Sequence, residues 1–523
     1  HHYHDQYLIM MYRRITGMLK TAAYLGYRYL ILGAFGCGAF RNDARTVSDI
    51  FCAALKKFDF DGMKAEDMFS RIDFAVMDRS QDQYNYKEFS RNFSDFYGDA
   101  DSEAIARAEK RIKEREVYLD AIRGCIFGGA AGDALGYPVE FYGEEEIFSI
   151  YGPAGITRYE KDPVTGKAMI SDDTQMSLFT ANGLLVGDTR GQLRGIRGLP
   201  RVYVAYAYLD WLKTQESSIH EVNRHERFSE EGGYSWLLDV PELYSRRAPG
   251  NTCLSALERE KAGETFEDYV EAKRNNSKGC GGIMRVAPMG LLDAAYQIIS
   301  GRGLYPTSRL AEAGATIAKT THLHPLGYLP AALMTLLISR IVPLTPNEVK
   351  TSIYQIVQDG LDVMSEMEGD EHHGDKEFLR LLTQRAVELA KSDVSDNDAI
   401  RQLGEGWTAE EAWAISLYCS LRHIDSMKDA IIAAVNHDGD SDSTGSITGN
   451  IMGAIYGYEA IKRERMFCPE GKRFEDTIEL HNIILALADD LYTGCIISEY
   501  DPIETPEKKQ WYARYCEMKP IGI

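Results

Sequence analysis

The stretch "NHDGDSDSTGSITGNIMGAIYG", residues 436–457, places carboxylates at alternate positions directly before a glycine-spaced apolar segment. The carboxylates are Asp438, Asp440 and Asp442, and Ser443 follows them. Carboxylates crowded in this way repel one another unless a cation holds them together. Donors that are all oxygen suit a hard ion, Mg²⁺ or Mn²⁺, better than zinc. The pattern therefore favours a metal site at the start of a helix.

Two other interpretations of this stretch were weighed. A calcium loop needs glycine at its sixth position and glutamate at its twelfth, where this chain has Ser443 and Gly449, so that interpretation fails. A helix N-cap of serine or aspartate is common and remains an alternative. A cap needs one such residue, however, and this stretch supplies several carboxylates and hydroxyls.

A second acidic cluster is found in "MISDDTQMSLFTANGLL", residues 169–185, where Ser171, Asp172 and Asp173 precede a predicted helix. Capping is again the alternative, because Asp172 and Gln175 have the spacing of a capping box. Taken together with the cluster at 440–443, this one gives four carboxylates and several hydroxyls, which is about the donor set of two metal ions.

Three further segments carry candidate residues. Glu140 lies in "GDALGYPVEF" and is a candidate functional carboxylate. The alternative is that it is an ordinary surface glutamate. The glycine-rich segment 275–288, "NNSKGCGGIMRVAP", is able to offer backbone N–H groups to a diphosphate, although it is no Walker motif. The segment "TTHLHPLGY" offers His322 and His324, either of which would more often be structural.

Glycine recurs every fourth residue in two segments, which lines the glycines along one face of a helix. The positions are Gly124, Gly128, Gly132 and Gly136 in the first segment and Gly445, Gly449, Gly453 and Gly457 in the second. Each interior glycine costs about 1 kcal/mol relative to alanine, so close approach of another helix must compensate. A membrane dimer is excluded by Asp133 and Asn450 within these short segments. We predict two central helices that pack on each other.

Composition limits the function classes. The chain has 523 residues, 44% of them hydrophobic, and a formal net charge of −21, which argues against binding nucleic acid. Positive charge for an anionic substrate would have to come from helix N-termini, backbone N–H groups or metal ions. The nine cysteines form no C-x-x-C motif, which predicts reduced thiols in a cytoplasmic protein. We expect no membrane span, and the oligomeric state stays open.

The coarse pattern predicts a mainly α-helical chain with a smaller N-terminal α/β segment. A helix at 6–26, an apolar run "YRYLILG", a glycine loop, a helix and the run "IDFAVMD" are typical of a parallel α/β unit. The expected parts are an α/β segment at 1–98, a charged helical linker at 99–118, an all-α domain at 119–495 and a surface tail at 496–523.

The motifs "IRGCIFGGAAGDALGYPVEF", "SDDTQM", "PGNTC", "GCGGIMRVAP", "THLHPLGY" and "GDSDSTGSITGNIMGAIYG" occur in this order. Together they resemble the ADP-ribosylglycohydrolase family, which includes the dinitrogenase-reductase-activating glycohydrolase. The resemblance implies an all-α fold with a binuclear Mg²⁺ or Mn²⁺ centre. It further implies a hydrolase that cleaves the glycosidic bond between ADP-ribose and a modified protein or related acceptor.

The resemblance also implies roles for individual residues. The implied metal ligands are Ser171, Asp172, Asp173, Asp440, Asp442 and Ser443. Glu140 and Asp173 match the catalytic acidic positions. The implied substrate-binding residues are Gly281, Gly282, Met284 and His322. Longer regions near 190–270 and 340–410 leave the choice of acceptor open.

The N-terminal part has a resemblance of its own. The segment "LILGAFGCGAFRNDARTVSDIF", followed by "IDFAVMD", is similar to the C-terminal half of the macrodomain-like fold of microbial poly(ADP-ribose) glycohydrolases. There the glycine loop, here Gly33 to Phe40, wraps the diphosphate of ADP-ribose. The catalytic acidic motif of that fold belongs to a part that precedes this sequence. The resemblance therefore implies a partial macrodomain that does not catalyse alone.

Two rival functions remain. A non-catalytic ADP-ribose-binding or crystallin-like member of the same fold predicts missing metal ligands, and none of the expected ones is missing. A two-metal phosphoesterase would share the metals but not the macrodomain-like segment. The sequence therefore favours an enzyme that acts on ADP-ribose conjugates.

Overall fold

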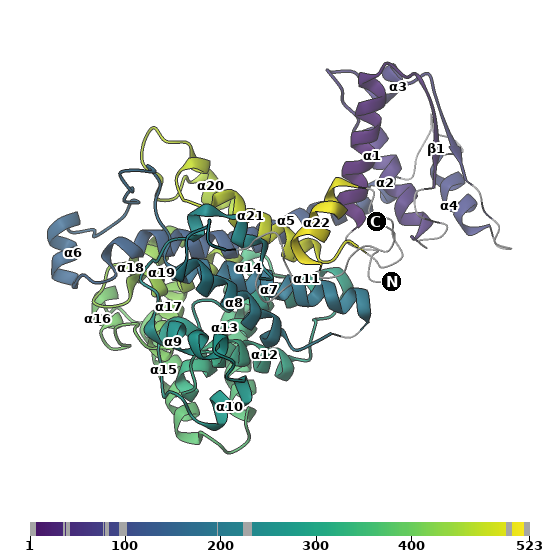
Figure 1. Ribbon diagram of the computed structural model, residues 1–523. Coiled ribbons are helices and arrows are strands. Elements are labelled where there is room, and N and C mark those ends of the chain that lie inside the picture. Colours follow the sequence, from purple (N-terminus) through teal and green to yellow (C-terminus); the bar gives the residue numbers. More distant parts are fainter. Residues whose placement is uncertain are drawn as a thin grey trace. The chain divides into compact units, whose positions relative to one another are not determined.

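Figure 1 shows the computed structural model, which is mainly helical with one small sheet, as the sequence predicts. It describes residues 7–34, 37, 42–76, 78, 83–93, 102–195, 197–222, 233–497 and 505–516. The chain forms two compact units. The first comprises His1–Tyr118 with Ile299–Gly301, and the second comprises Leu119–Ile298 with Arg302–Ile523. Within the described ranges, no helix combines the length and the apolarity that a membrane crossing requires.

The first unit contains the predicted α/β arrangement. Its elements are α1 (Tyr7–Tyr24), β1 (Tyr29–Gly33), α2 (Ala44–Lys56), α3 (Ala65–Met68), β2 (Arg71–Ala75) and α4 (Tyr84–Phe93). The two strands pair in parallel, from Tyr29 opposite Arg71 to Gly33 opposite Ala75. The predicted order of strand, helix and strand is thus confirmed. Most of the predicted diphosphate loop, Gly33 to Phe40, lies outside the described residues.

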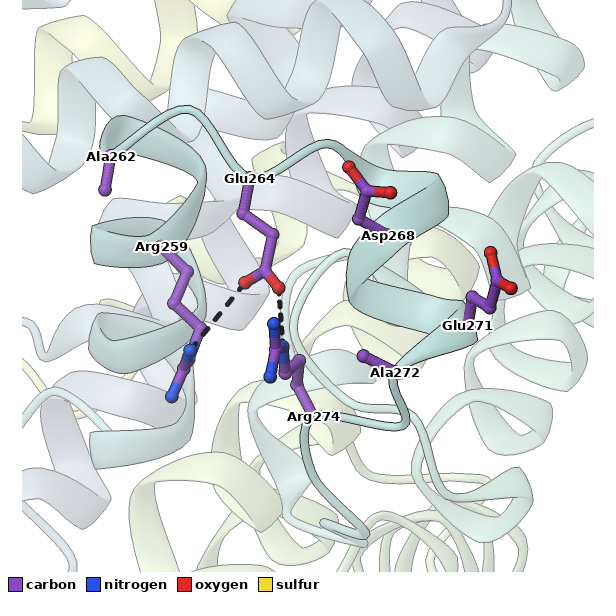
Figure 2. Close-up of a pocket in the computed structure, with 7 residues that line it drawn as sticks. All are labelled: Arg259, Ala262, Glu264, Asp268, Glu271, Ala272 and Arg274. Carbon is purple, nitrogen blue, oxygen red and sulfur yellow. Dashed lines mark hydrogen bonds and ion pairs between the residues drawn. The ribbon is translucent and has the colours of Figure 1, made fainter.

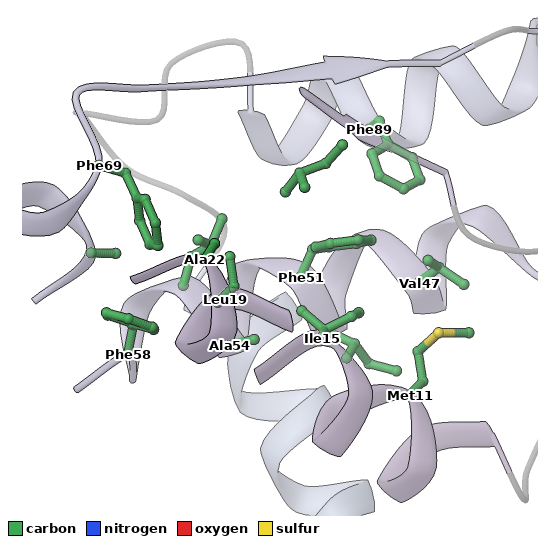
Figure 3. Packing of buried hydrophobic residues seen from close by; sticks show 14 of the residues in the cluster. Met11, Ile15, Leu19, Ala22, Val47, Phe51, Ala54, Phe58, Phe69 and Phe89 are labelled. Carbon is green, nitrogen blue, oxygen red and sulfur yellow. The ribbon is translucent and has the colours of Figure 1, made fainter. Parts of the chain in front are cut away.

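The core of the first unit forms between α1, α2 and the sheet (Figure 3). Met11, Ile15 and Leu19 recur every four residues and are buried, so they form one face of α1. Phe51 of α2 is fully buried, and its ring meets that of Phe74 edge-on at 5.1 Å between centroids. The apolar periodicity of the helices therefore explains the packing of this unit.

The second unit is built almost entirely of helices. The helix α5 (Ser102–Gly136) belongs to this unit from Leu119 onward, and α11 (Ala287–Ser300) belongs to it up to Ile298. The other helices, from the N-terminus, are η1 (Tyr137–Val139), α6 (Glu144–Tyr151), α7 (Asp172–Arg194), α8 (Pro200–Glu216), η2 (Trp236–Asp239), η3 (Pro241–Leu243), α9 (Asn251–Lys261), α10 (Phe266–Glu271), η4 (Cys280–Gly282), α12 (Thr307–Lys319) and α13 (Pro325–Ile341). They continue with α14 (Pro346–Glu366), α15 (His373–Ala390), α16 (Asp396–Ile400), α17 (Ala409–Arg422), α18 (Met427–Val435), α19 (Ser441–Tyr456), α20 (Tyr458–Arg463), η5 (Phe474–Asp476), α21 (His481–Thr493) and α22 (Pro506–Tyr515). From Ser102 onward, the charged segment expected to be a linker forms the first part of α5.

The two glycine-striped helices pack directly on each other. A Cβ atom added at Gly128 or Gly132 of α5 would overlap backbone atoms of Gly449 or Gly445 in α19. Gly124 lies against Gly453 in the same way, so the helices run antiparallel. Every residue of α19 from its first to Ile455 is buried. The prediction that the two glycine-striped helices pack on each other is confirmed.

The C-terminal segment differs from the surface tail expected at 496–523. It contains α22, in which Trp511 and Tyr515 are 3% and 1% exposed. The indole Nε1 of Trp511 donates a hydrogen bond to Thr189 Oγ1 of α7 at 3.1 Å. Two aromatic residues one helical turn apart are enough to bury one side of a short, otherwise polar helix, which explains the difference.

Candidate functional site

The contact between α5 and α19 brings a set of acidic residues to one place. Gly136 ends α5 and lies against Ser441 and Asp442 at the start of α19, where an added Cβ would be 2.7 Å from the Cα of Asp442. The short helix η1 follows directly, and Glu140 comes next in the chain. The end of α5 therefore delivers Glu140 to the N-terminus of α19.

Asp133, one turn before the end of α5, joins this helix to the start of α7. Its fully buried carboxylate accepts hydrogen bonds from the backbone N–H groups of Ser171 at 2.9 Å and Thr174 at 3.1 Å. These groups belong to the first turn of α7, which has no intrahelical partners for them. This role of Asp133 is not among those predicted from the sequence. The available signal was a single charged residue among small ones in a glycine-striped segment.

The N-terminus of α7 carries the first predicted metal-binding group. Ser171 is the N-cap, and its Oγ accepts from the N–H of Asp173 at 3.2 Å. Asp172 and Asp173 are both buried. The capping-box pairing of Asp172 with Gln175 does not form, because the Gln175 amide bonds Ser245 and the Trp211 indole instead. The capping box predicted as the alternative for Asp172 is thus absent.

The N-terminus of α19 carries the second group. Asp440 is the N-cap, and its Oδ1 accepts from the N–H of Ser443 at 3.3 Å. The thiol of Cys280 donates to Asp440 Oδ2 at 2.8 Å. Asp442 accepts the same Ser443 N–H at 2.9 Å, and its buried carboxylate lies near enough to the side chains of Asp440 and Ser171 for both to affect its pKa. Asp442 therefore links the two predicted groups.

Asp438, the first of the three alternate aspartates, lies apart from this cluster. It is exposed, and its Oδ1 accepts from the N–H of Glu144 at 2.7 Å, at the start of α6. Asp438 is thus a cap for a neighbouring helix, whereas Asp440 and Asp442 face the buried cluster.

Burial and mutual repulsion disfavour the charged forms of these carboxylates. Desolvation, then the charge of Asp442, raises the pKa values of Asp172 and Asp173 well above the usual range, and that of Asp440 likewise. The same causes raise the pKa of Glu140 to about 10. Desolvation raises the pKa of Asp133 to about 7. In the described part of the chain, no lysine or arginine forms an ion pair with any of them.

The donor chemistry fits a hard cation. Asp173 Oδ1 and Glu140 Oε2 are buried and have no hydrogen-bond partner. Such orphaned carboxylate oxygens are costly unless a cation or proton occupies the space beside them. Within the described residues, however, no three His, Cys, Asp or Glu side chains are arranged closely enough to hold a metal ion. The site thus has the oxygen donors and negative charge for a divalent cation without a closed coordination shell.

The glycine-rich segment lies beside the second acidic group. Cys280 N–H donates to the carbonyl of Trp407 at 3.1 Å, and its thiol reaches Asp440. An added Cβ at Gly281 would lie 2.9 Å from Cys253 Sγ, and one at Gly282 would lie 2.7 Å from the carbonyl of Gly327. These positions therefore require glycine because neighbouring atoms already fill the space.

The other residues predicted to bind substrate, and the neighbouring His324, differ in burial and in their contacts. His322 is 2% exposed and lies against the glycine segment, 3.0 Å from an added Cβ at Gly281. Met284 is buried in the core, and its carbonyl accepts from Ser177 of α7 at 3.2 Å. His324 caps α13 by accepting from the N–H of Leu326 at 3.0 Å, which is a structural role.

A surface hollow of about 660 Å³ lies elsewhere, between α9 and α10 (Figure 2). Glu264 lies at its centre and forms ion pairs with Arg274 at 2.5 Å and Arg259 at 3.8 Å. None of the acidic cluster residues lines it. The two arginines are held by Glu264, so this hollow offers little free positive charge to an anionic ligand.

A sequence model of the family described as ADP-ribosylglycohydrolase matches residues 114–498. The chain belongs to this family. Its match spans both acidic clusters and the glycine-rich segment, so all of the site residues predicted from the sequence lie within the family region.

Two relatives and one solved structure are similar to this chain. ADP-ribosylhydrolase ARH3 of Mus musculus is 25% identical over 385 residues, which cover 69% of this chain and 89% of that protein. The Homo sapiens protein of the same name is 24% identical over 387 residues, covering 70% and 94%. A solved structure, "ADP-ribosylglycohydrolase-related protein complex", has 22% identity and a TM-score of 0.46, covering 72% of this chain and 98% of that one.

Proposed function

We propose that this ADP-ribosylglycohydrolase is a hydrolase that cleaves the glycosidic bond of ADP-ribose conjugates and needs two divalent cations, Mg²⁺ or Mn²⁺. One observation carries the proposal: buried carboxylates from α5, α7 and α19 converge with no basic side chain to neutralise them among the described residues. The names of the relatives, ADP-ribosylhydrolase, support the same reaction class.

Under this proposal, two sets of residues would hold the cations. Ser171, Asp172 and Asp173 form one set, and Asp440, Asp442 and Ser443 form the other. Bound cations would supply Lewis acidity that polarises the ribose hydroxyls and a water molecule. Asp442 is the natural shared ligand, because it already contacts residues of both sets.

Glu140 is proposed as the catalytic acid or base, together with Asp173. Departure of the acceptor builds positive charge at the anomeric carbon, so a nearby carboxylate stabilises that charge and takes a proton from the attacking water. The raised pKa of Glu140, with its orphaned Oε2, gives it a proton-transfer role that cation binding would adjust.

An assay of ADP-ribose release shows directly which linkage between ADP-ribose and its acceptor is cleaved. We expect release of free ADP-ribose from at least one of arginine-linked, serine-linked or base-linked substrates, abolished by a chelator and restored by Mg²⁺ or Mn²⁺. Full activity after thorough chelation would refute the two-cation proposal. Tight ADP-ribose binding with no turnover on any linkage would favour the alternative, a non-catalytic ADP-ribose-binding member of the fold.

A further inference from the structure

Arg285 is a fully buried arginine within the glycine-rich segment 275–288, three residues after Gly282. Its Nη1 contacts two sulfur atoms, Met176 Sδ at 3.3 Å and Cys253 Sγ at 3.5 Å. Its guanidinium lies over the ring of Tyr208, 4.4 Å from the centroid. No carboxylate pairs with it among the residues that the structure describes, and its Nε has no hydrogen-bond partner. A buried cation without a counter-charge is costly, which calls for a role outside its own packing.

A hydrogen-bond relay connects this cation to His322. Arg285 Nη2 donates to Thr321 Oγ1 at 2.6 Å, and Thr321 Oγ1 lies 2.8 Å from His322 Nδ1. A guanidinium only donates, so the threonine oxygen accepts from it and keeps its own proton to donate. The nearer of the two acceptors within reach is His322 Nδ1, because the carbonyl of Ala318 lies at 3.4 Å.

The relay fixes the state of the imidazole. With Nδ1 accepting, the ring proton sits on Nε2, which lies 3.0 Å from an added Cβ at Gly279 and so faces the glycine-rich segment. Desolvation and the charge of Arg285 lower the pKa of His322 to about 3, which keeps the ring neutral in the physiological range. A neutral Nε2–H donor, backbone N–H groups and a buried positive charge thus lie together in a chain of net charge −21.

We propose that Arg285 is a positioning residue: through Thr321 it holds His322 as an Nε2–H donor, and its buried charge supplies the positive potential for an anionic ligand group at the glycine-rich segment. The inference rests on the proposed function for the identity of that group, the diphosphate of ADP-ribose. It adds a source of positive charge that neither the metal ligands nor the backbone N–H groups of the glycines provide.

The relay itself is tested without any ligand. In protein labelled with ¹⁵N-histidine, the His322 ring signals are assigned by their loss in His322→Gln. We expect the Nε2–H tautomer in the wild type and a shift toward the other tautomer in Thr321→Val. The matched control is Thr335→Val, because Thr335 Oγ1 is also buried but has no hydrogen-bond partner. An Nδ1–H ring in the wild type, or one that Thr321→Val leaves unchanged, overturns the relay.

The second part of the proposal is that the charge of Arg285 favours binding of an anionic group. It is tested by calorimetry of ADP-ribose binding in the presence of Mg²⁺. Thr321→Val and Arg285→Met should each weaken binding about tenfold or more, as expected for a lost charge-assisted interaction. Arg285→Lys should recover part of the loss, and Thr335→Val should bind as the wild type does. Equal affinity in wild type and Thr321→Val overturns the inference, even if Arg285→Met does not fold. A wild type that binds no ADP-ribose refutes the proposed function instead, while the tautomer experiment still decides the relay.

Discussion

Gly132 of α5 lies directly against the backbone carbonyl of Gly445 in α19, with no room for a side chain at either position. The contact joins the helix that carries Asp133 to the helix whose first turn carries Asp442. Stability and site geometry therefore depend on the same close approach, and a change at either glycine affects both.

Replacement of Gly132 by alanine should destabilise the protein by about 1–3 kcal/mol or more, because the new methyl group overlaps the α19 backbone. Gly374 of α15 is the matched control, since a Cβ there meets nothing within 4 Å. Gly374→Ala should be neutral or stabilising by up to about 1 kcal/mol. Urea unfolding of both variants makes the comparison, and equal stability of the two would contradict the glycine contact as described.

Asp442→Asn should lower metal affinity and turnover by orders of magnitude while the fold persists. Asparagine keeps the shape and the capping ability of aspartate but removes the charge, so a helix cap alone would lose only a few tenths of a kcal/mol. The thermal stability of the metal-free variant should rise, because one charge leaves a crowded cluster.

Asp438→Asn provides the control for this change, since Asp438 is exposed and caps α6. It should bind Mg²⁺ and turn over substrate as the wild type does. The measurements are calorimetric metal binding and ADP-ribose release. If Asp442→Asn matched the wild type in both, Asp442 would be a first-turn residue of α19 with no part in metal binding.

The metal-free protein should lose stability as the pH rises. Asp133 and Glu140 have pKa values of about 7 and about 10, above their ordinary values of 3.8 and 4.5. For each group, the folded state binds more protons than the unfolded state at pH values between its ordinary pKa and its raised pKa. The free energy of unfolding therefore falls as the pH rises through that window. The midpoint of thermal unfolding in a chelator should decrease from pH 5 toward pH 9.

Added Mg²⁺ should reduce this slope, because a cation takes over the role of the bound protons. Its stabilising effect should thus be larger at pH 8 than at pH 5.5. Parallel stability curves with and without Mg²⁺ would mean that the cation binds away from these carboxylates.

Deletion of residues 1–98 should leave metal binding and hydrolysis largely intact. The acidic clusters, the glycine-rich segment and His322 all lie in the second compact unit. The measurement is turnover per bound metal in the truncated and the full chain. A truncated protein that folds and binds metal yet has no turnover would show that the first unit contributes to the active site.

The spacing of residues along the chain predicted those features of the site that lie within a single helix. The four-residue glycine repeat predicted that α5 and α19 pack together, because the period of a helix places such residues on one face. The acidic residues at the starts of α7 and α19 were visible as Asp172, Asp173, Asp440 and Asp442. The repeat could not show which residues of the two helices meet, since any register that pairs the stripes satisfies the pattern.

Roles that depend on contacts between residues distant in the chain could not be predicted from the sequence. Asp133 is a single carboxylate whose function is to cap a helix that begins 39 residues later, and no local pattern signals this. The role of Arg285 arises from Thr321 and His322, which are distant in sequence. The C-terminal helix was missed because α22 is polar apart from its few aromatic residues.

The pairing of Trp511 with Thr189 joins residues that are 322 positions apart in the chain. During synthesis at about 5–20 residues per second, some 15–65 s separate the appearance of these two partners. Through that interval α7, whose first turn holds Asp172 and Asp173, lacks the helix that covers its far end. We therefore expect the nascent chain to expose apolar surface of α7 until α22 has left the ribosome, and chaperone binding to this surface to fall once α22 has docked.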